Sequence, residues 1–492
     1  MSETVTKKRI VKGFGWKLLE RFANQGLTLA VTLILSRILG PAQYTKLAII
    51  NIFITIADVF VQSGLSTALI QKKEEPDQKD YSSVFFMSFG VASVFYALIF
   101  FLSPIILGYF NSADLVVPLR VTSLVLFLGA FTSVQNAIVA RKLDFKIVFI
   151  SCISAGIISG TAAIIAAVCG LGIWALVIHF TVNRLIMFIV MWIFVKWRPQ
   201  FTFSGKNVKK LFSFGWKVML SSLIDAIYQD ARSLFIKKKY PEDEAALGIY
   251  NRGQQVPQVL VTSLNGAVQT VMLPALSAYQ SDRPKMKSMV RRAIMSGSYI
   301  IYPMMAGLLV MAGPLIQIVL GDKWLASIPI LQIYCLNYIF WPTHSANLQA
   351  VNALGRSDKY LIMEIIKKFF DFGILIASLL LFENIAMIAW GSVLSNVISS
   401  VINAWPNKKL IDYGYFEQIK DVLPNAALAV FMSGCVFAMS FIPLNIYILT
   451  AIRLVAGVGI YVGLSKLFKL ESFNYILETM KEMLPKKEKK EK

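Results

Sequence analysis

The segment Gly13-Phe14-Gly15-Trp16-Lys17 returns 200 residues later as Ser213-Phe214-Gly215-Trp216-Lys217. The same offset relates further identical pairs: Pro41 and Pro241, Leu47 and Leu247, Ile49 and Ile249, and Asn51 and Asn251. Some of these matches are polar residues inside apolar segments. We therefore expect the two halves of the chain to form the same set of helices.

Each half carries two polar stripes with the spacing i, i+4, i+7, i+11, which places four side chains on one helix face. The first stripe is Arg21, Gln25, Thr28, Thr32, and its counterpart is Ser221, Asp225, Tyr228, Arg232. The second stripe is Asn51, Thr55, Asp58, Gln62, and its counterpart is Asn251, Gln255, Gln258, Thr262. Two repeated halves with facing polar stripes are what an alternating-access transporter requires.

Composition places the chain among membrane proteins. With 56% hydrophobic and 16% charged residues and a mean hydropathy of +0.63, the 492 residues lie outside the average soluble range. Apolar runs of about 20 residues can cross a hydrocarbon core of roughly 30 Å as helix. We expect fourteen, near residues 13–38, 43–69, 83–109, 115–140, 146–169, 171–195, 208–235, 245–278, 289–318, 325–353, 359–382, 384–405, 421–441 and 444–468. The expected fold class is an all-α polytopic membrane protein.

Lysine and arginine gather in alternate loops. The loops on the same side of the membrane as the amino terminus hold clusters of Lys and Arg. The loops on the other side have few basic residues apart from residues 237–239, which three acidic residues follow. The positive-inside rule then places both termini in the cytoplasm, so most of the +21 net charge reflects topology. The basic tail at residues 486–490 is expected to touch anionic lipid or nothing, and no nucleic acid.

The sequence gives little support for enzyme chemistry. The two histidines, His179 and His344, lie in different halves without a cysteine or carboxylate at metal-ligand spacing. We expect no catalytic residue and no metal site. The four cysteines and the glycines of the apolar segments are interpreted as packing residues: Cys152, Cys169, Cys335, Cys435, Gly156, Gly160, Gly170 and Gly172.

Ionisable residues inside apolar segments are the main functional candidates. A charge at mid-bilayer costs roughly 2.5–3.5 kcal/mol or more, so such a side chain usually faces a cavity or a partner. The candidates are Glu20, Arg21, Asp58, Asp225, Arg232, Arg252, Glu364, Lys367, Lys368 and Asp371. Asp58 has no basic residue within one turn of its own helix, so it either pairs across helices or is protonated.

Two groups of these candidates have a structural alternative. Glu20 and Arg21 lie early in their helix and can instead reach the cytoplasmic interface. Glu364, Lys368 and Asp371 lie at i, i+4, i+7, so pairing along their own helix and lining of a cavity both stay open.

Several short motifs are spread over nearly the whole chain. They are Gln62-Ser63-Gly64-Leu65, Ile70-Gln71-Lys72-Lys73-Glu74, Ala140-Arg141-Lys142-Leu143-Asp144-Phe145, Met272-Leu273-Pro274-Ala275-Leu276, Gly321-Asp322-Lys323-Trp324 and Ile328-Pro329-Ile330-Leu331-Gln332. Together and in this order they resemble those of the Wzx-type polysaccharide-repeat flippases. These flippases belong to the multidrug/oligosaccharidyl-lipid/polysaccharide (MOP) exporter superfamily, and the chain is most similar to the branch of colanic-acid and teichuronic-acid exporters.

The resemblance implies two pseudo-symmetric six-helix bundles, at residues 1–200 and 201–410, around a central cavity. Residues 411–470 would be two additional membrane helices, and residues 471–492 a cytoplasmic basic tail. The related lipid II flippases place an arginine in helix eight against the anionic head group, and Arg252 matches that position. Their cavity arginine in helix one is not matched here, where Gln25 and Val31 align, and Arg21 is the nearest substitute.

The resemblance also implies a substrate, a polyprenyl-diphosphate-linked oligosaccharide that crosses from the cytoplasmic to the outer leaflet of the bacterial inner membrane. Arginine suits a diphosphate because its planar fork bonds oxygens in pairs, and amides suit sugar hydroxyls. The residues assigned to substrate binding are Arg21, Asn51, Arg232, Asn251, Arg252, Gln255 and Gln258. Those assigned to cation coupling or charge compensation are Asp58, Asp225, Glu364, Lys368 and Asp371.

Other functions stay open. A cavity dominated by carboxylates would favour a cation-coupled multidrug antiporter of the MATE type, in the same superfamily. A membrane-embedded glycan polymerase or ligase would usually need a large extracytoplasmic loop and a catalytic constellation, and the sequence shows neither. An assembly scaffold would have no wet cavity. No cofactor is expected beyond a possible H⁺ or Na⁺ gradient, and the expected partners besides the lipid-linked glycan are a polysaccharide polymerase and assembly proteins.

Overall fold

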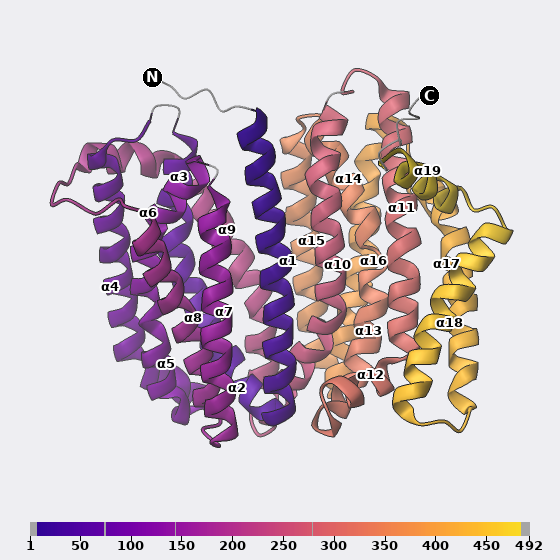
Figure 1. Cartoon of the computed structure of the whole chain (residues 1–492), viewed down its shortest axis with the longest axis horizontal. Coiled ribbons are helices and arrows are strands. Elements are labelled where there is room, and N and C mark those ends of the chain that lie inside the picture. The colour runs from indigo at the N-terminus through magenta and orange to yellow at the C-terminus, as the bar shows by residue number, and fades with distance from the viewer. Residues whose placement is uncertain (1–6, 73–74, 143, 278, 484–492) are drawn as a thin grey trace, which may run out of the picture. The chain divides into compact units, whose positions relative to one another are not determined.

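The computed structural model describes residues 7–72, 75–142, 144–277 and 279–483, and every regular element in these ranges is a helix. The chain forms two compact units, Met1–Gly248 and Ile249–Lys492. Figure 1 shows the helices of each unit in the colours of their order along the chain. The expected all-α fold class is confirmed.

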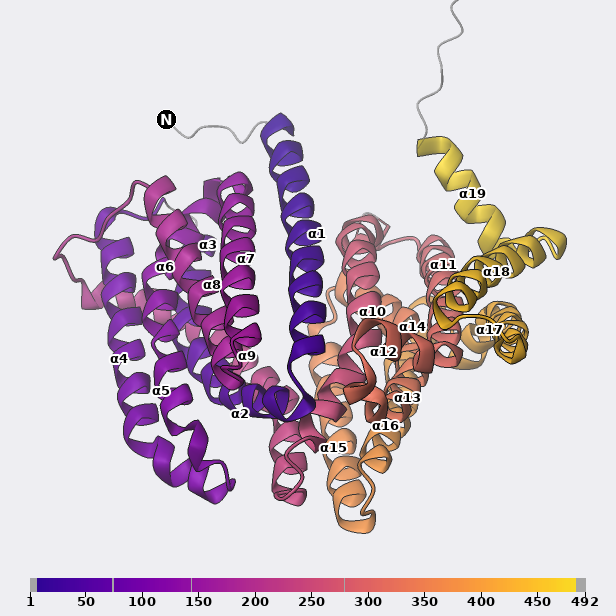
Figure 2. The same cartoon turned by 60° about the horizontal axis from the view of Figure 1, so that its bottom comes forward.

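The first unit is built from long helices and a few short turns. Its elements are α1 (Lys7–Ile38), α2 (Pro41–Asp58), the π-helix η1 (Val59–Ser63), α3 (Gly64–Gln71), α4 (Gln78–Tyr109), the 3₁₀ turn η2 (Ala113–Leu115), α5 (Val116–Ser123), α6 (Val125–Lys142), α7 (Phe145–Val168), α8 (Ile173–Phe194) and α9 (Gly205–Lys239). Helix α7 packs between α1 and α8, and Figure 2 shows α1 running beside α7.

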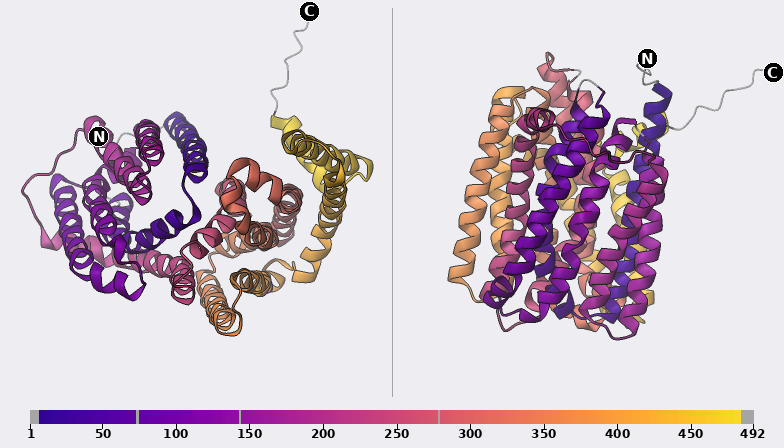
Figure 3. Two further views of the ribbon diagram at one scale, coloured as in Figure 1. Left: turned by 90° about the horizontal axis from the view of Figure 1, so that it is seen from below. Right: turned by 90° about the vertical axis from the view of Figure 1, so that its left-hand side faces the viewer.

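The second unit begins inside a helix, α10 (Ala246–Ser277). It continues with α11 (Arg283–Val310), α12 (Ala312–Val319), η3 (Asp322–Ser327), α13 (Ile328–Tyr338), α14 (Trp341–Ala353), α15 (Ser357–Leu381), α16 (Ile385–Ile411), α17 (Tyr415–Ala438), η4 (Met439–Phe441), α18 (Ile446–Leu467) and α19 (Glu471–Met483). Helix α17 packs on α11, and α18 packs on α17. Figure 3 shows α17 and α18 at the outer edge of this unit, in yellow.

Ten helical segments within the described residues are long and apolar enough to cross a membrane. They are Pro41–Ile70, Gln78–Tyr109, Ala113–Lys142, Phe145–Val168, Ile173–Phe194, Arg283–Val310, Asp322–Ala353, Ile385–Ile411, Tyr415–Phe441 and Ile446–Leu467. Each coincides with one expected apolar run. The other four expected runs coincide with α1, α9, α10 and α15, which are long helices interrupted by polar and charged residues. The chain is therefore a multi-pass membrane protein, and the count of fourteen stays a prediction.

Helix α9 lies in the first unit, where it packs against α3 and α2. Backbone N–H groups and side chains fix its beginning: Asn207 Nδ2 donates to Asp80 Oδ1 at 2.9 Å, and the Ser204 N–H donates to Ser83 Oγ at 2.9 Å. The compact units thus divide at Gly248, whereas the repeat places the division at residue 200. The assignment of residues 201–410 to one bundle by symmetry stays a prediction.

Glycines mark the closest helix contacts. A Cβ at Gly156 or Gly160 of α7 would overlap side chains of α1, which agrees with their interpretation as packing residues. Gly170 and Gly172 have a different role, because they lie in the turn between α7 and α8 with φ of +78° and +55°. Glycine adopts such positive φ values without the steric penalty of a side chain.

Candidate functional site

The polar stripe of α2 ends at a carboxylate that is paired with another helix. Asp58 is the last residue of α2, and its Oδ2 lies 3.4 Å from Nη2 of Arg184 on α8. Its Oδ1 accepts a hydrogen bond from Nε2 of Gln62. Of the two alternatives for Asp58, the structure shows pairing across helices. The pair offsets part of the roughly 2.5–3.5 kcal/mol or more that a lone charge costs at mid-bilayer.

Sequence reasoning missed Arg184, because it belongs to neither polar stripe and the repeat does not mark it. Its position was the available signal: it is the single Lys, Arg, Asp or Glu in the 22 residues of α8. A guanidinium at the middle of an apolar helix of that length needs a partner or water.

Asn51 lies two turns before Asp58 on α2 and is half-buried. Its Oδ1 has no hydrogen-bond partner among the described atoms. An amide oxygen that is buried and unsatisfied can accept a bond from a ligand hydroxyl or from water.

The predicted arginines of α1 and α9 make no ion pair or hydrogen bond with Asp58 in the described part of the structure. Arg21 is exposed on α1, and Arg232 is half-buried on α9. Asp225 lies in α9, but its side chain is outside the described part of the structure.

In the second unit, Arg252 is buried, with 5% of its surface exposed. Its Nη1 donates to Oε1 of Gln255 at 2.8 Å, and its guanidinium lies 5.1 Å from the ring centroid of Trp324. Asn251 and Gln258 are half-buried on the same helix, and Gln255 is exposed. Trp324 belongs to one of the motifs that carry the family resemblance. This motif therefore supports Arg252 on one face, and Gln255 binds it on another.

Two of the charged side chains of α15 pair with each other along the helix, and another, Asp371, is buried. Lys367 Nζ lies 2.6 Å from Oε1 of Glu364, so Glu364 pairs along its own helix with Lys367. Asp371 is 9% exposed and shares a hydrogen bond with Ser395 of α16. Lys368 is half-buried. Whether Lys368 and Asp371 take part in coupling stays a prediction.

Other motif residues meet at the end of α3. Nη1 of Arg141 donates to the carbonyl oxygens of Leu69, Ile70 and Lys72 at 2.9, 2.9 and 2.8 Å. Lys72 in turn lies 2.5 Å from Oδ2 of Asp80, at the start of α4. Since the last carbonyls of a helix lack partners within it, Arg141 caps α3. Two motifs thus have a structural role here.

The expected basic tail begins with a helix. Glu471 of α19 accepts two hydrogen bonds from Arg291 of α11, at 2.6 and 2.9 Å, and Arg291 also bonds Asp421 of α17 at 3.0 Å. The bond from Arg291 lowers the pKa of Glu471, although partial burial opposes this shift. The α19 helix is therefore docked on α11 and α17.

The two histidines lie in different surroundings. His344 is buried with its Nδ1 2.7 Å from Nδ2 of Asn403, and one ring nitrogen of His179 is buried as well. Within the described residues, no three His, Cys, Asp or Glu side chains are grouped so that they could hold a metal ion.

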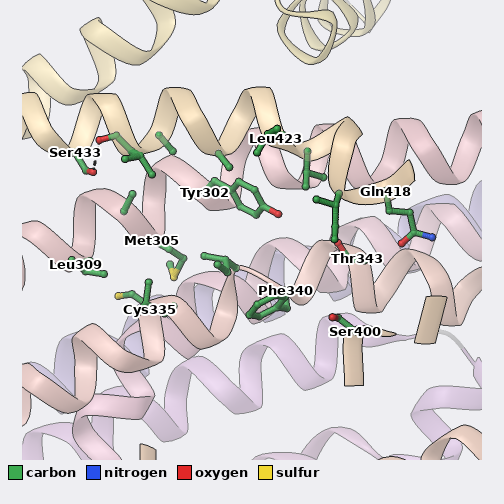
Figure 4. A pocket seen from close by; sticks show the side chains of 18 of the residues that line it. Tyr302, Met305, Leu309, Cys335, Phe340, Thr343, Ser400, Gln418, Leu423 and Ser433 are labelled. Carbon is green, nitrogen blue, oxygen red and sulfur yellow. Dashed lines mark hydrogen bonds between the residues drawn. The ribbon is translucent and has the colours of Figure 1, made fainter. Parts of the chain in front are cut away.

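A cavity of about 430 Å³ lies between α11, α13, α14, α16 and α17 (Figure 4). Thr343, Ser400 and Gln418 lie toward one end of it, and Leu309 and Cys335 toward the other. None of the residues assigned to substrate binding lines it, and its lining carries no charged side chain. Such a lining suits hydrocarbon rather than a diphosphate.

An all-helical fold with ten helical segments long and apolar enough to span a membrane, within the described residues, is that of a multi-pass membrane protein. Residues 34–329 match the family described as polysaccharide biosynthesis protein, and the chain belongs to this family. It is 23% identical to the teichuronic acid biosynthesis protein TuaB of Bacillus subtilis, over 83% of this chain and 85% of that protein. It is also 23% identical to the succinoglycan biosynthesis transport protein ExoT of Rhizobium meliloti, over 68% of each chain.

Solved structures share the fold. The lipid II flippase MurJ in an inward closed conformation superposes with a TM-score of 0.76 at 17% identity, covering 91% of this chain and 97% of that one. An inward-facing MATE transporter of the MOP superfamily gives a TM-score of 0.57 at 16% identity, covering 82% and 96%. These two structures show the shared fold. The family match and the sequence relatives confirm the resemblance to Wzx-type flippases. ExoT is named as a transport protein, in agreement with the prediction that the chain is not an enzyme.

Proposed function

We propose that the chain flips polyprenyl-diphosphate-linked oligosaccharide units from the cytoplasmic to the outer leaflet of the inner membrane, for synthesis of a surface polysaccharide. The observation that carries the proposal is a buried arginine, Arg252, within a long helix of a chain of the polysaccharide biosynthesis family. Arg252 supplies planar donors that suit a diphosphate. The amides of Asn51, Asn251 and Gln258 suit sugar hydroxyls.

The topology that goes with this function has fourteen membrane helices and both termini in the cytoplasm. In this topology the membrane spans are the ten apolar helical segments and four further helices, α1, α9, α10 and α15. Their polar faces are explained if they border water rather than lipid. A gradient of H⁺ or Na⁺ is proposed to drive the cycle through one of the intramembrane carboxylates.

The test uses purified protein in sealed vesicles that contain a fluorescent polyprenyl-diphosphate oligosaccharide. A membrane-impermeant quencher then reports the fraction of the lipid in the outer leaflet. We expect the protein to make all of the labelled lipid accessible over time, whereas protein-free vesicles keep the inner-leaflet fraction protected. The measurement is made without a gradient and with an imposed H⁺ or Na⁺ gradient, and no flipping by correctly folded protein under any of these conditions would refute the proposal.

Arg252 gives the matched variants. Arg252→Ala should abolish flipping, and Arg252→Lys should restore only part, because a point charge cannot reproduce paired bonds to phosphate oxygens. A labelled organic cation in the same vesicles tests the antiporter alternative. Cation transport without lipid flipping would favour the MATE-type function.

A further inference from the structure

Arg184 lies deep in the membrane-spanning helix α8, and its ion pair with Asp58 leaves part of its side chain exposed. It follows the first residue of α8 by eleven positions, which puts it about 16 Å along the helix from that end. This depth is close to the middle of a hydrocarbon core of roughly 30 Å. Even so, 35% of its side chain is exposed. Hydrocarbon cannot solvate an exposed guanidinium, so the exposed side must face water or a bound anion.

The contacts of Arg184 leave most of its donors open. Within the described residues it has one ion pair, at 3.4 Å to Asp58, and one ring contact, 5.9 Å from the centroid of Phe180. A guanidinium has five N–H donors, and charge-assisted bonds are typically about 2.7–2.9 Å long. Arg184 is therefore loosely held.

A structural arginine in the same chain looks different. Arg453 of α18 is 2% exposed and donates to the carbonyl oxygens of Val436 and Val310 at 3.0 and 3.1 Å. These bonds fasten Arg453 to two neighbouring helices, and Arg453 also lines a cavity between α11, α17 and α18. Arg184 differs from it, because Arg184 has one long polar contact and a larger exposed fraction.

Two features lie next to Asp58, a π-helix and a glycine. The π-helix η1 begins directly after Asp58, and such irregular turns are frequent at functional sites. On α6, a Cβ at Gly129 would lie 3.1 Å from Asp58 Oδ1 and 2.9 Å from Gln62 Nε2. The missing side chain makes room for both polar groups. Gln62 fixes one oxygen of Asp58 and leaves the other for Arg184.

We propose that Arg184 is an anion-binding residue of the first unit, which takes phosphate oxygens of the transported lipid while Asp58 is its resident counter-ion. The inference rests on the proposed function and adds a second phosphate site to the one at Arg252. The long contact to Asp58 yields to paired bonds from phosphate oxygens. When the anion leaves, Asp58 again compensates Arg184, so the positive charge of Arg184 is never left unpaired.

The test is a binding measurement that needs no transport. Farnesyl diphosphate is the probe, farnesol is the uncharged control, and the protein is purified in nanodiscs. Arg184→Gln should weaken binding of the diphosphate by about tenfold or more, because bonds to charged groups contribute about 1.5–3 kcal/mol. Arg184→Lys should be intermediate. Asp58→Asn should tighten binding, because the competing carboxylate is gone.

Lys196→Gln is the matched control, since Lys196 is an exposed cation just beyond α8. Equal binding by Arg184→Gln and the native protein would overturn the inference. So would weaker binding by Asp58→Asn, which is what a purely structural ion pair predicts. If binding depends on Arg184 but no lipid is flipped, the proposed function fails while the site stands. If flipping depends on Arg252 but binding of farnesyl diphosphate is the same in Arg184→Gln and the native protein, only the inference fails.

Discussion

The contact between α9 and α3 yields a prediction with a defined magnitude. An alanine Cβ at Gly215 of α9 would lie 2.6 Å from the carbonyl oxygen of Gly64 on α3 and 2.8 Å from its carbonyl carbon. Both atoms are backbone, so no side-chain rotation relieves the overlap. Such overpacking costs about 1–3 kcal/mol, whereas Gly→Ala in a helix otherwise stabilises by roughly 0.5–1 kcal/mol. We expect Gly215→Ala to lose about 1–2 kcal/mol of stability on balance.

Two other glycines provide the controls. A Cβ at Gly64 would lie 3.0 Å from the Gly215 oxygen, and a Cβ at Gly26 of α1 would meet nothing within 4 Å. The apparent unfolding midpoint in detergent, at one heating rate, should therefore fall most for Gly215→Ala, less for Gly64→Ala, and not at all for Gly26→Ala. A midpoint for Gly215→Ala at or above that of Gly26→Ala would show that the helices separate without cost, and would refute the packing argument.

Three further predictions concern topology, a buried arginine and the last helix. Single cysteines at Glu242 and Ser204, at opposite ends of α9, should differ in a background without native cysteines: only the one at Glu242 should react with an impermeant maleimide outside the cell. The reverse pattern contradicts the orientation. Arg453→Gln should lower stability by about 1–3 kcal/mol for each carbonyl left unsatisfied, as measured by thermal unfolding, and an unchanged midpoint would argue against its role. Glu471→Gln should release α19 from Arg291, seen as faster amide exchange in that helix. Because the pKa of Glu471 is lowered in the fold, its contribution is present above the ordinary value of 4.5 and is lost as the pH falls through the lower folded value. Equal exchange in the variant and the native protein would contradict this contribution.

Apolar length predicted the helices well, but it did not predict where they break. The run near 115–140 contains α5 and most of α6, with Leu124 between them, and the run near 325–353 contains the end of η3 followed by α13 and α14. The π-helix after Asp58 was likewise not visible in the spacing of the stripe. Hydropathy measures whether a segment suits the bilayer, and a break of one turn hardly changes that sum.

The sequence predicted only part of the candidate site, because a pattern within one helix does not reveal contacts with another helix. Periodicity assigns a residue to a face of its own helix, and this placed Asp58 and Arg252 among the candidates. It cannot say which residue of another helix will meet that face. The partner Arg184 is 126 positions away from Asp58 in sequence. Likewise, Glu364 pairs with Lys367 at i+3 rather than with Lys368, which depends on rotamers that the sequence does not reveal.

The boundary between the two compact units falls inside a single helix, α10. Gly248 ends the first unit, and its N–H donates to Thr45 Oγ1 of α2 at 2.7 Å. Arg252, four residues later, lies 5.1 Å from the ring centroid of Trp324 in the second unit. The chain therefore passes from the packing of one unit to the packing of the other within one helical turn, about 6 Å long, and has no loop between them.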